Sequence, residues 1–261
     1  MSTENILTEV RGRVGILTIN RPKQLNALDT ATLEQMEAAL TRFEKDSAVH
    51  VIVITGAGER AFVAGGDIAD LLSRQGLAHY NEFAEVIHRV FRRFEVCDKP
   101  TIAAINGWAL GGGTELLLTL DVRLVAEEAK LGLPEITLGL FPGAGGSQRL
   151  IRQIPLCRAK ELLFTGDQIT AQEAVALGLC NRAVPRERLM EEAMALAERI
   201  ADKSSMVLKL LKRAVSQGSE MHLQAALQHE QAVIGLVLDT KDAHEGCSAF
   251  LEKRKPNFTG S

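Results

Sequence analysis

Hydrophobic and polar residues alternate in two short runs near the start of the chain, 6–10 and 14–20, which a turn-forming RGR tripeptide separates. A period of two is typical of β-strands, so these runs predict a β-hairpin. Residues 49–55, 101–106 and 122–126 are almost continuously apolar instead, which predicts strands buried on both faces.

Segments in which apolar residues recur at helical spacing lie between these runs and after them. Asp29 can cap a helix whose apolar stripe recurs every three to four residues, and residues 83–94 carry a second stripe of this kind. The first stripe consists of Leu33, Met36, Leu40 and Phe43. After residue 185 three helical patterns follow one another with no strand between them, at 187–202, 205–217 and 220–238. Strands that alternate with helices predict an α/β fold. We therefore expect an α/β core over 1–185 and a helical segment over 186–261.

Composition and charge exclude several classes of protein. The 261 residues are 46% hydrophobic and 24% charged, as in an ordinary globular protein and unlike a disordered chain. Thirty basic and 33 acidic residues give a net charge of −3, which offers no general field for nucleic acid or an anionic membrane. Lys209, Lys212 and Arg213 form a small basic cluster, for which a solvated face is the expected role and RNA binding the alternative.

Cysteine usage and the N-terminal sequence indicate a reducing compartment. The four cysteines are scattered, without a C-x-x-C pair or histidines at ligand spacing, so we expect reduced thiols and no metal. The first residues have neither a basic, apolar leader nor the composition of a transit peptide, and no apolar run reaches the ~18 residues of a membrane span. A cytoplasmic protein is the resulting expectation.

Four glycine-rich segments lie within the predicted core: TGAGER (55–60), AGGD (64–67), LGGGTE (110–115) and PGAGGSQR (142–149). The first resembles a dinucleotide fingerprint, but further glycines follow it at once and the position ~20 residues on falls within a helical pattern. The last lacks the Lys-Ser/Thr ending of a phosphate-binding loop. No G-x-S-x-G sequence is present to supply a serine nucleophile.

Two glutamates have sequence surroundings that suit proton transfer. Glu115 is expected in the first turn of a helix that begins within Gly111–Gly113, and apolar residues follow it. Glu135 follows LGLP and precedes Ile136. Burial in such surroundings raises the pKa of a carboxyl group toward neutrality. A solvated capping residue is the competing interpretation for either glutamate alone; the two together favour acid–base chemistry.

The glycine-rich turns can also supply backbone donors. Segments 64–67 and 111–113 each lead into a predicted helix and can present an N–H group there. Two such donors that converge on one carbonyl oxygen form an oxyanion hole, in which each donor contributes about 2.7–4 kcal/mol to transition-state stabilisation. For AGGD alone, tight packing is the simpler explanation of the glycines.

Taken in order, these segments resemble the enoyl-CoA hydratase/isomerase (crotonase) superfamily, and most of all a bacterial enoyl-CoA hydratase. The resemblance covers nearly the whole chain. It rests on INRPKQLNAL (19–28), VIVITGAGERAFVAGGDI (51–68), KPTIAAINGWALGGGTELLLTLDVRLV (99–125), AKLGLPEITLGLFPGAGGSQRL (129–150), LFTGDQITAQEAVALGL (163–179) and EGCSAFLEKRKPNF (245–258). It implies a spiral of ββα units with a helical trimerisation segment, and a homotrimer or a dimer of trimers.

The resemblance also implies roles for individual residues. Glu115 would be the base that activates water, Glu135 would deliver a proton to C2, and the N–H groups of Ala64 and Gly112 would hold the thioester oxygen. Other positions match residues that line the substrate or CoA site of the family, and some members reach a neighbouring subunit's CoA through the last two: Gly65, Gly66, Asp67, Ile68, Pro134, Gly143, Phe250 and Lys253. Coenzyme A is then part of the substrate, and no separate cofactor is expected.

The implied activity is reversible syn addition of water to a 2-enoyl-CoA, of the EC 4.2.1.17 type. Isomerases of the family generally keep only the glutamate that matches Glu135, so the presence of Glu115 favours hydration. An isomerase, or a hydratase of a branched or carboxylated enoyl-CoA, stays open as an alternative. Trp108, Thr114, Leu133 and Phe141 depart from residues common in the family, which leaves the acyl-chain preference undetermined.

Overall fold

A computed structural model describes residues 4–261 and contains two β-sheets. The six-stranded sheet has the order β1-β2-β3-β5-β7-β10, and the four-stranded sheet has the order β4-β6-β8-β9. The strands are β1 (Ile6–Arg11), β2 (Val14–Ile19), β3 (Val51–Gly56), β4 (Ala61–Val63), β5 (Thr101–Ile105), β6 (Trp108–Leu110), β7 (Val122–Ala126), β8 (Lys130–Gly132), β9 (Gln168–Thr170) and β10 (Arg182–Val184).

Successive pairs of strands divide between the two sheets. β3, β5 and β7 lie side by side and parallel in the larger sheet, while β4, β6 and β8, which follow them along the chain, lie parallel in the smaller one. The chain therefore advances by one strand in each sheet per turn, which is the predicted spiral. The predicted hairpin is confirmed: β1 and β2 are antiparallel, with Ile6 opposite Ile19.

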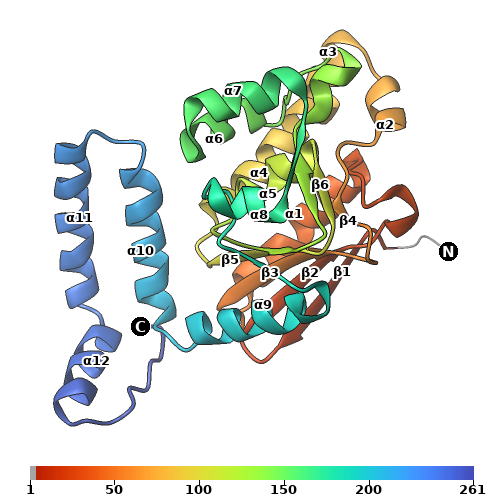
Figure 1. The fold of residues 1–261 in the computed structure, drawn as a ribbon. Helices are drawn as coiled ribbons and strands as arrows, with labels where there is room; N and C mark the ends of the chain where they lie inside the picture. Colours follow the sequence, from red (N-terminus) through yellow and green to blue (C-terminus); the bar gives the residue numbers. More distant parts are fainter. Residues whose placement is uncertain (1–3) are drawn as a thin grey trace.

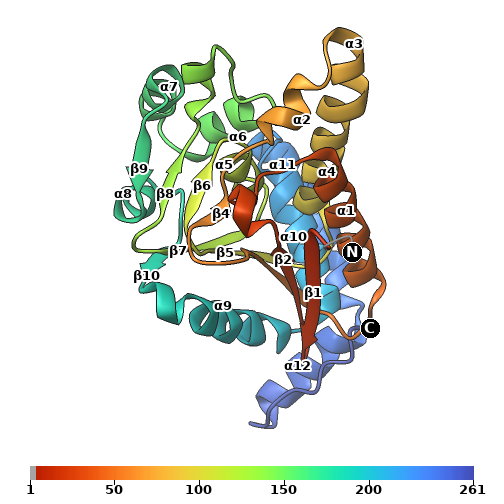
Figure 2. The same cartoon turned by 90° about the vertical axis from the view of Figure 1, so that its right-hand side faces the viewer.

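Helices cover the sheets on the outside (Figures 1 and 2). Asp29 caps the first long helix by accepting from the Thr32 N–H, and the predicted apolar stripe of this helix is buried, as is the stripe over 83–94. The α-helices are α1 (Thr30–Lys45), α2 (Ile68–Leu72), α3 (Gly76–His79), α4 (Glu85–Val96), α5 (Gly112–Leu117), α6 (Gly146–Gln153), α7 (Leu156–Thr165), α8 (Ala171–Ala176), α9 (Arg186–Ala201), α10 (Ser205–Gly218), α11 (Leu223–Leu238) and α12 (Lys241–Leu251). Shorter helical turns are η1 (Pro22–Gln24), η2 (Tyr80–Ala84) and η3 (Pro134–Leu138).

Helix α9 belongs to the core. It lies along the six-stranded sheet (Figure 1), and its buried face consists of small residues and one leucine: Leu189, Ala193, Ala197 and Ala201. The helical segment that leaves the core therefore begins at α10, one helix later than the boundary expected at residue 185. The sequence shows where strands end, but it does not show that α9 still packs on the sheet.

Helices α10, α11 and α12 form an arm beside the core and pack on one another (Figure 1). Ion pairs attach α10 to the core: Lys209 and Arg213 contact Asp98, and Lys212 contacts Asp121. The basic cluster is thus neutralised by acidic partners and does not form a free basic stripe. Among the helices of residues 4–261, none combines the length and the apolar character needed to cross a membrane.

Candidate active site

The candidate site lies at one edge of the four-stranded sheet. Strands β4, β6 and β8 are parallel neighbours, so the segments that follow them emerge at the same edge. These segments are the AGGD loop, the glycine-rich start of α5, and Pro134–Leu138. The topology thereby brings Gly66, Gly112 and Glu135 together from three successive turns of the spiral.

A backbone ladder determines which N–H group of the AGGD loop is available. Ala64 donates its N–H to the Leu25 carbonyl at 3.1 Å, while Leu28 receives from Asp67 at 2.8 Å and donates to Gly65 at 2.9 Å. In such a parallel pairing alternate residues face the partner segment, so the N–H of Gly66 points away from it. The structure therefore contradicts the assignment of Ala64 as an oxyanion donor, because its N–H is already bonded.

The N–H groups of Gly66 and Gly112 lie close together. A Cβ atom built on Gly112 would be 3.4 Å from the Gly66 nitrogen. Gly112 is the first residue of α5, where helix N–H groups have no partner within the helix. Within residues 4–261, neither N–H group donates to another group of the protein. The site thus contains two adjacent, unused backbone donors.

Glu115 is buried in the first turn of α5, with 3% of its surface exposed. Its Oε1 accepts hydrogen bonds from the N–H groups of Ala144 at 2.7 Å and Gly146 at 2.8 Å. The pKa of Glu115 is raised to about 7, chiefly by burial and in smaller part by Glu135, while the two amide hydrogen bonds and Arg149 oppose the rise. The carboxyl group is consequently fixed in orientation and able to titrate near neutral pH.

Glu135 has a different environment in η3. A Cβ atom built on Gly111 would be 2.8 Å from its Oε1, so the carboxyl group lies beside the start of α5. Its Oε2 is buried and, among residues 4–261, has no hydrogen-bond partner. Burial raises the pKa of this carboxyl as well. Two carboxyls with elevated pKa values, one held by amides and one without a partner, can divide the roles of base and acid.

The other residues expected in the substrate site fall into two groups. Gly65, Asp67, Ile68 and Pro134 lie at the same sheet edge as Glu135; Asp67 caps α2 and forms an ion pair with Arg21 at 3.0 Å. Gly143 lies on the loop before α6, next to Ala144. Phe250 and Lys253 are not brought into this site, because they lie at the exposed end of α12. Their predicted role at a neighbouring subunit stays a prediction.

Sequence reasoning missed three residues that contact the site. Ala144 and Gly146 hold Glu115, and Arg149 supports their loop. The only sequence signal was the PGAGGSQR segment, of which Gly143 alone was predicted to line the substrate site.

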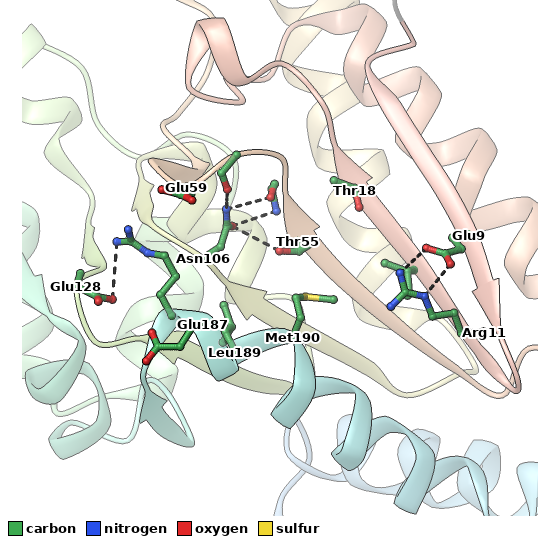
Figure 3. Close-up of a pocket in the computed structure, with 14 residues that line it drawn as sticks. Glu9, Arg11, Thr18, Thr55, Glu59, Asn106, Glu128, Glu187, Leu189 and Met190 are labelled. Carbon is green, nitrogen blue, oxygen red and sulfur yellow. Dashed lines mark hydrogen bonds and ion pairs between the residues drawn. The ribbon is translucent and has the colours of Figure 1, made fainter.

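A separate cavity of about 640 Å³ lies between the six-stranded sheet and the start of α9 (Figure 3). None of the predicted site residues lines it. Two of its polar side chains bond to the protein itself: Arg11 pairs with Glu9, and Asn106 bonds to the backbone of Gly56 and Gly58. This cavity contains neither of the two glutamates nor the Gly66 and Gly112 N–H groups that make up the candidate site.

Comparison with known proteins identifies the family of the chain. A model of the enoyl-CoA hydratase/isomerase family matches residues 9–261. The crotonyl-CoA hydratase of Syntrophomonas wolfei is 43% identical over 258 residues, which cover 99% of both chains. The short-chain-enoyl-CoA hydratase of Clostridium acetobutylicum is 40% identical and covers 98% of this chain and 97% of its own.

Solved structures show the same fold. The crystal structure of enoyl-CoA hydratase from Bacillus anthracis matches with a TM-score of 0.95 and 42% identity, covering 99% of this chain and 100% of that one. The expected crotonase-like fold is thereby confirmed. The chain belongs to the enoyl-CoA hydratase/isomerase family.

Proposed function

We propose that this enzyme adds water reversibly across the C2=C3 double bond of a 2-enoyl-CoA to give a 3-hydroxyacyl-CoA. The observation that carries the proposal is the pair of buried carboxyls, Glu115 and Glu135, beside the two unused N–H groups of Gly66 and Gly112. The donors suit a thioester oxygen, which becomes negatively charged as water attacks C3. The carboxyls suit the proton transfers of the same reaction.

In the proposed mechanism Glu115 is the base. Its ionised form is favoured by two amide hydrogen bonds, and these also fix the direction in which Oε2 faces. Glu115 takes a proton from water, whose oxygen bonds to C3, and the electron pair of the double bond moves toward the thioester oxygen. Glu135, whose buried Oε2 has no hydrogen-bond partner and whose pKa is raised by burial, gives a proton to C2.

One of the two backbone donors differs from the sequence prediction. We assign them to Gly66 and Gly112, because the Ala64 N–H is bonded to Leu25. A neutral amide pair stabilises negative charge on the thioester oxygen without a metal or redox cofactor, and CoA is supplied as part of the substrate.

A short unbranched acyl chain is the proposed substrate class. Two relatives are named for short-chain-enoyl-CoA and crotonyl-CoA, and the matches cover 97% and 99% of their lengths. A second candidate is a carboxylated enoyl-CoA, since a relative from Escherichia coli, 42% identical over 248 residues, is named 2,3-dehydroadipyl-CoA hydratase. Isomerisation alone is disfavoured because Glu115 is retained and held in place.

We also propose that the chain acts as a cytoplasmic homo-oligomer, a trimer or a dimer of trimers. The arm exposes large apolar side chains on α11 and α12, an amount that is unusual for a monomer. They are Leu223, Leu227, Ile234, Leu236, Leu238, Phe250 and Leu251. A second copy of the chain is the occupant that the family membership favours for this surface.

The test of the reaction is the loss of the conjugated enoyl-thioester absorbance when the purified protein meets crotonyl-CoA. We expect rapid loss, and recovery of the absorbance from 3-hydroxybutyryl-CoA. Glu34→Gln, an exposed carboxyl on α1, serves as the control and should keep wild-type activity, whereas Glu115→Gln should not. If crotonyl-CoA and 2,3-dehydroadipyl-CoA both stay unchanged, hydration of these substrates is refuted.

A further inference from the structure

Arg149 lies in α6, behind Glu115, and three of its guanidinium nitrogens donate hydrogen bonds to other groups of the protein. Nε and Nη2 donate to the two carboxylate oxygens of Glu95, at 3.0 and 3.1 Å, and Nη1 donates to the Ala144 carbonyl at 3.2 Å. The Arg149 side chain is only 16% exposed. A two-pronged, shielded pair of this kind fixes geometry better than an ordinary surface ion pair.

The same residue that accepts from Arg149 also holds Glu115. Ala144 receives the Arg149 Nη1–H on its carbonyl and donates its own N–H to Glu115 Oε1 at 2.7 Å. Gly146 adds the second bond to that oxygen at 2.8 Å. A continuous chain of contacts therefore runs from Glu95 in α4 through Arg149 in α6 and the loop to Glu115 in α5.

The loop is shaped around the guanidinium group. Gly145 has a φ of 103°, and a Cβ atom built on it would be 2.0 Å from Arg149 Nη1. Any side chain at this position would displace the arginine from the loop. Gly145 thus serves two needs at once, the left-handed turn and the close approach of Arg149.

We propose that Arg149, held by Glu95, is a positioning residue that orients Glu115 for attack on water. Arg149 acts through the Ala144–Gly146 loop and does not touch the substrate. This inference rests on the proposed function, in which Glu115 is the base.

The charges around Glu115 give the proposal a pH-dependent readout. Glu115 faces Glu135 from η3 and Arg149 from α6, and Glu95 and Arg92 of α4 lie behind Arg149. The positive charge of Arg149 favours the ionised form of Glu115. Its removal raises the pKa of Glu115, so the acid limb of the kcat profile moves to higher pH.

The experiment compares Arg149→Met and Arg149→Lys with Arg152→Met, a matched change at an exposed position of the same helix. Turnover of crotonyl-CoA is measured from about pH 5.5 to about pH 9. We expect Arg149→Met to lower kcat by about 10- to 100-fold with little change in KM, because a carboxyl misplaced by about 1 Å costs that much. The acid limb of its kcat profile should move to higher pH. Arg149→Lys should lower kcat but leave the acid limb of the kcat profile at its wild-type pH. Arg152→Met should change neither kcat nor the acid limb.

A double-mutant cycle isolates the route through Glu115. In a Glu115→Gln background, Arg149→Met should have almost no further effect, because the group that it positions is already gone. An unchanged kcat and limb in Arg149→Met, or full additivity with Glu115→Gln, overturns the proposal. If Arg149→Met does not fold, Arg149→Lys and Glu95→Gln decide through kcat and through the same double-mutant cycle with Glu115→Gln, because both variants keep the positive charge near Glu115. Failure of the proposed function is distinct, because the wild type itself would then leave crotonyl-CoA unchanged.

Discussion

Replacement of Glu115 by glutamine should stabilise the protein while it abolishes turnover, and the gain should depend on pH. The pKa of Glu115 rises from 4.5 to about 7 on folding. At 1.36 kcal/mol per unit, this corresponds to about 3 kcal/mol. Because the native state binds this proton more tightly than the unfolded chain does, Glu115 lowers stability progressively as pH rises from about 4.5 to about 7. Glutamine keeps the shape and carries no charge, so it removes that loss.

The assay is urea unfolding of wild type and Glu115→Gln at about pH 4.5 and about pH 8.5. The protomer concentration is fixed, because assembly shifts apparent stability. The free energy of unfolding of the variant, relative to wild type, should grow by about 3 kcal/mol between the two pH values. In thermal unfolding this is a rise of roughly 5–10 °C. Glu34→Gln, at an exposed position on α1, should give the same small difference at both pH values.

One result would refute the reasoning. A stability difference between Glu115→Gln and wild type that is equal at both pH values means that burial does not control the titration of Glu115. Any constant offset from repacking the amide cancels in this comparison, so only the pH-dependent part decides.

Four further outcomes are expected. Glu135→Gln should lower kcat for crotonyl-CoA by about 10²- to 10⁴-fold with the fold intact, as judged by circular dichroism, since it removes the proton donor; near-normal turnover would assign that role elsewhere. Gly113→Ala should destabilise the core in urea unfolding, because its Cβ would lie 2.0 Å from the Val63 carbonyl oxygen, and wild-type stability would contradict that packing. Light scattering should give the mass of a trimer or hexamer, and a monomer would contradict the role of the arm. Lys212→Met should loosen the arm, seen as faster amide exchange in α10, because it breaks the pair of Lys212 with Asp121 at 2.7 Å.

Five strands of the larger sheet could be predicted from the sequence, whereas its three-residue strand β10 and the smaller sheet could not. The run at 49–55 is long enough and sufficiently β-branched to indicate β3. Strands β4, β6 and β8 have three residues each, which is too short for a hydrophobic period to be visible. Helix α12 was likewise missed.

The same limit applies to the site. Glu115 and Glu135 were identified from their apolar, glycine-rich surroundings, and the structure buries both to a degree that raises their pKa values. The choice between Ala64 and Gly66 depends on a pairing with the segment around Leu28, which is distant in sequence. No local pattern reports such a pairing. Arg149 was missed for the same reason, because its meaning comes from contacts with other elements.

The division of strands between two sheets has a consequence for how this site can change over evolution. The Gly66 and Gly112 donors follow β4 and β6, which are adjacent parallel strands, so their separation derives from a strand spacing of about 4.8 Å. In the proposed mechanism, main-chain geometry and no side chain maintains the capacity to polarise a thioester. The carboxyl groups stand on separate elements, α5 and η3. If the proposed roles hold, mutation can exchange the proton-transfer groups independently, and a descendant can acquire a new reaction while it inherits the two backbone donors unchanged.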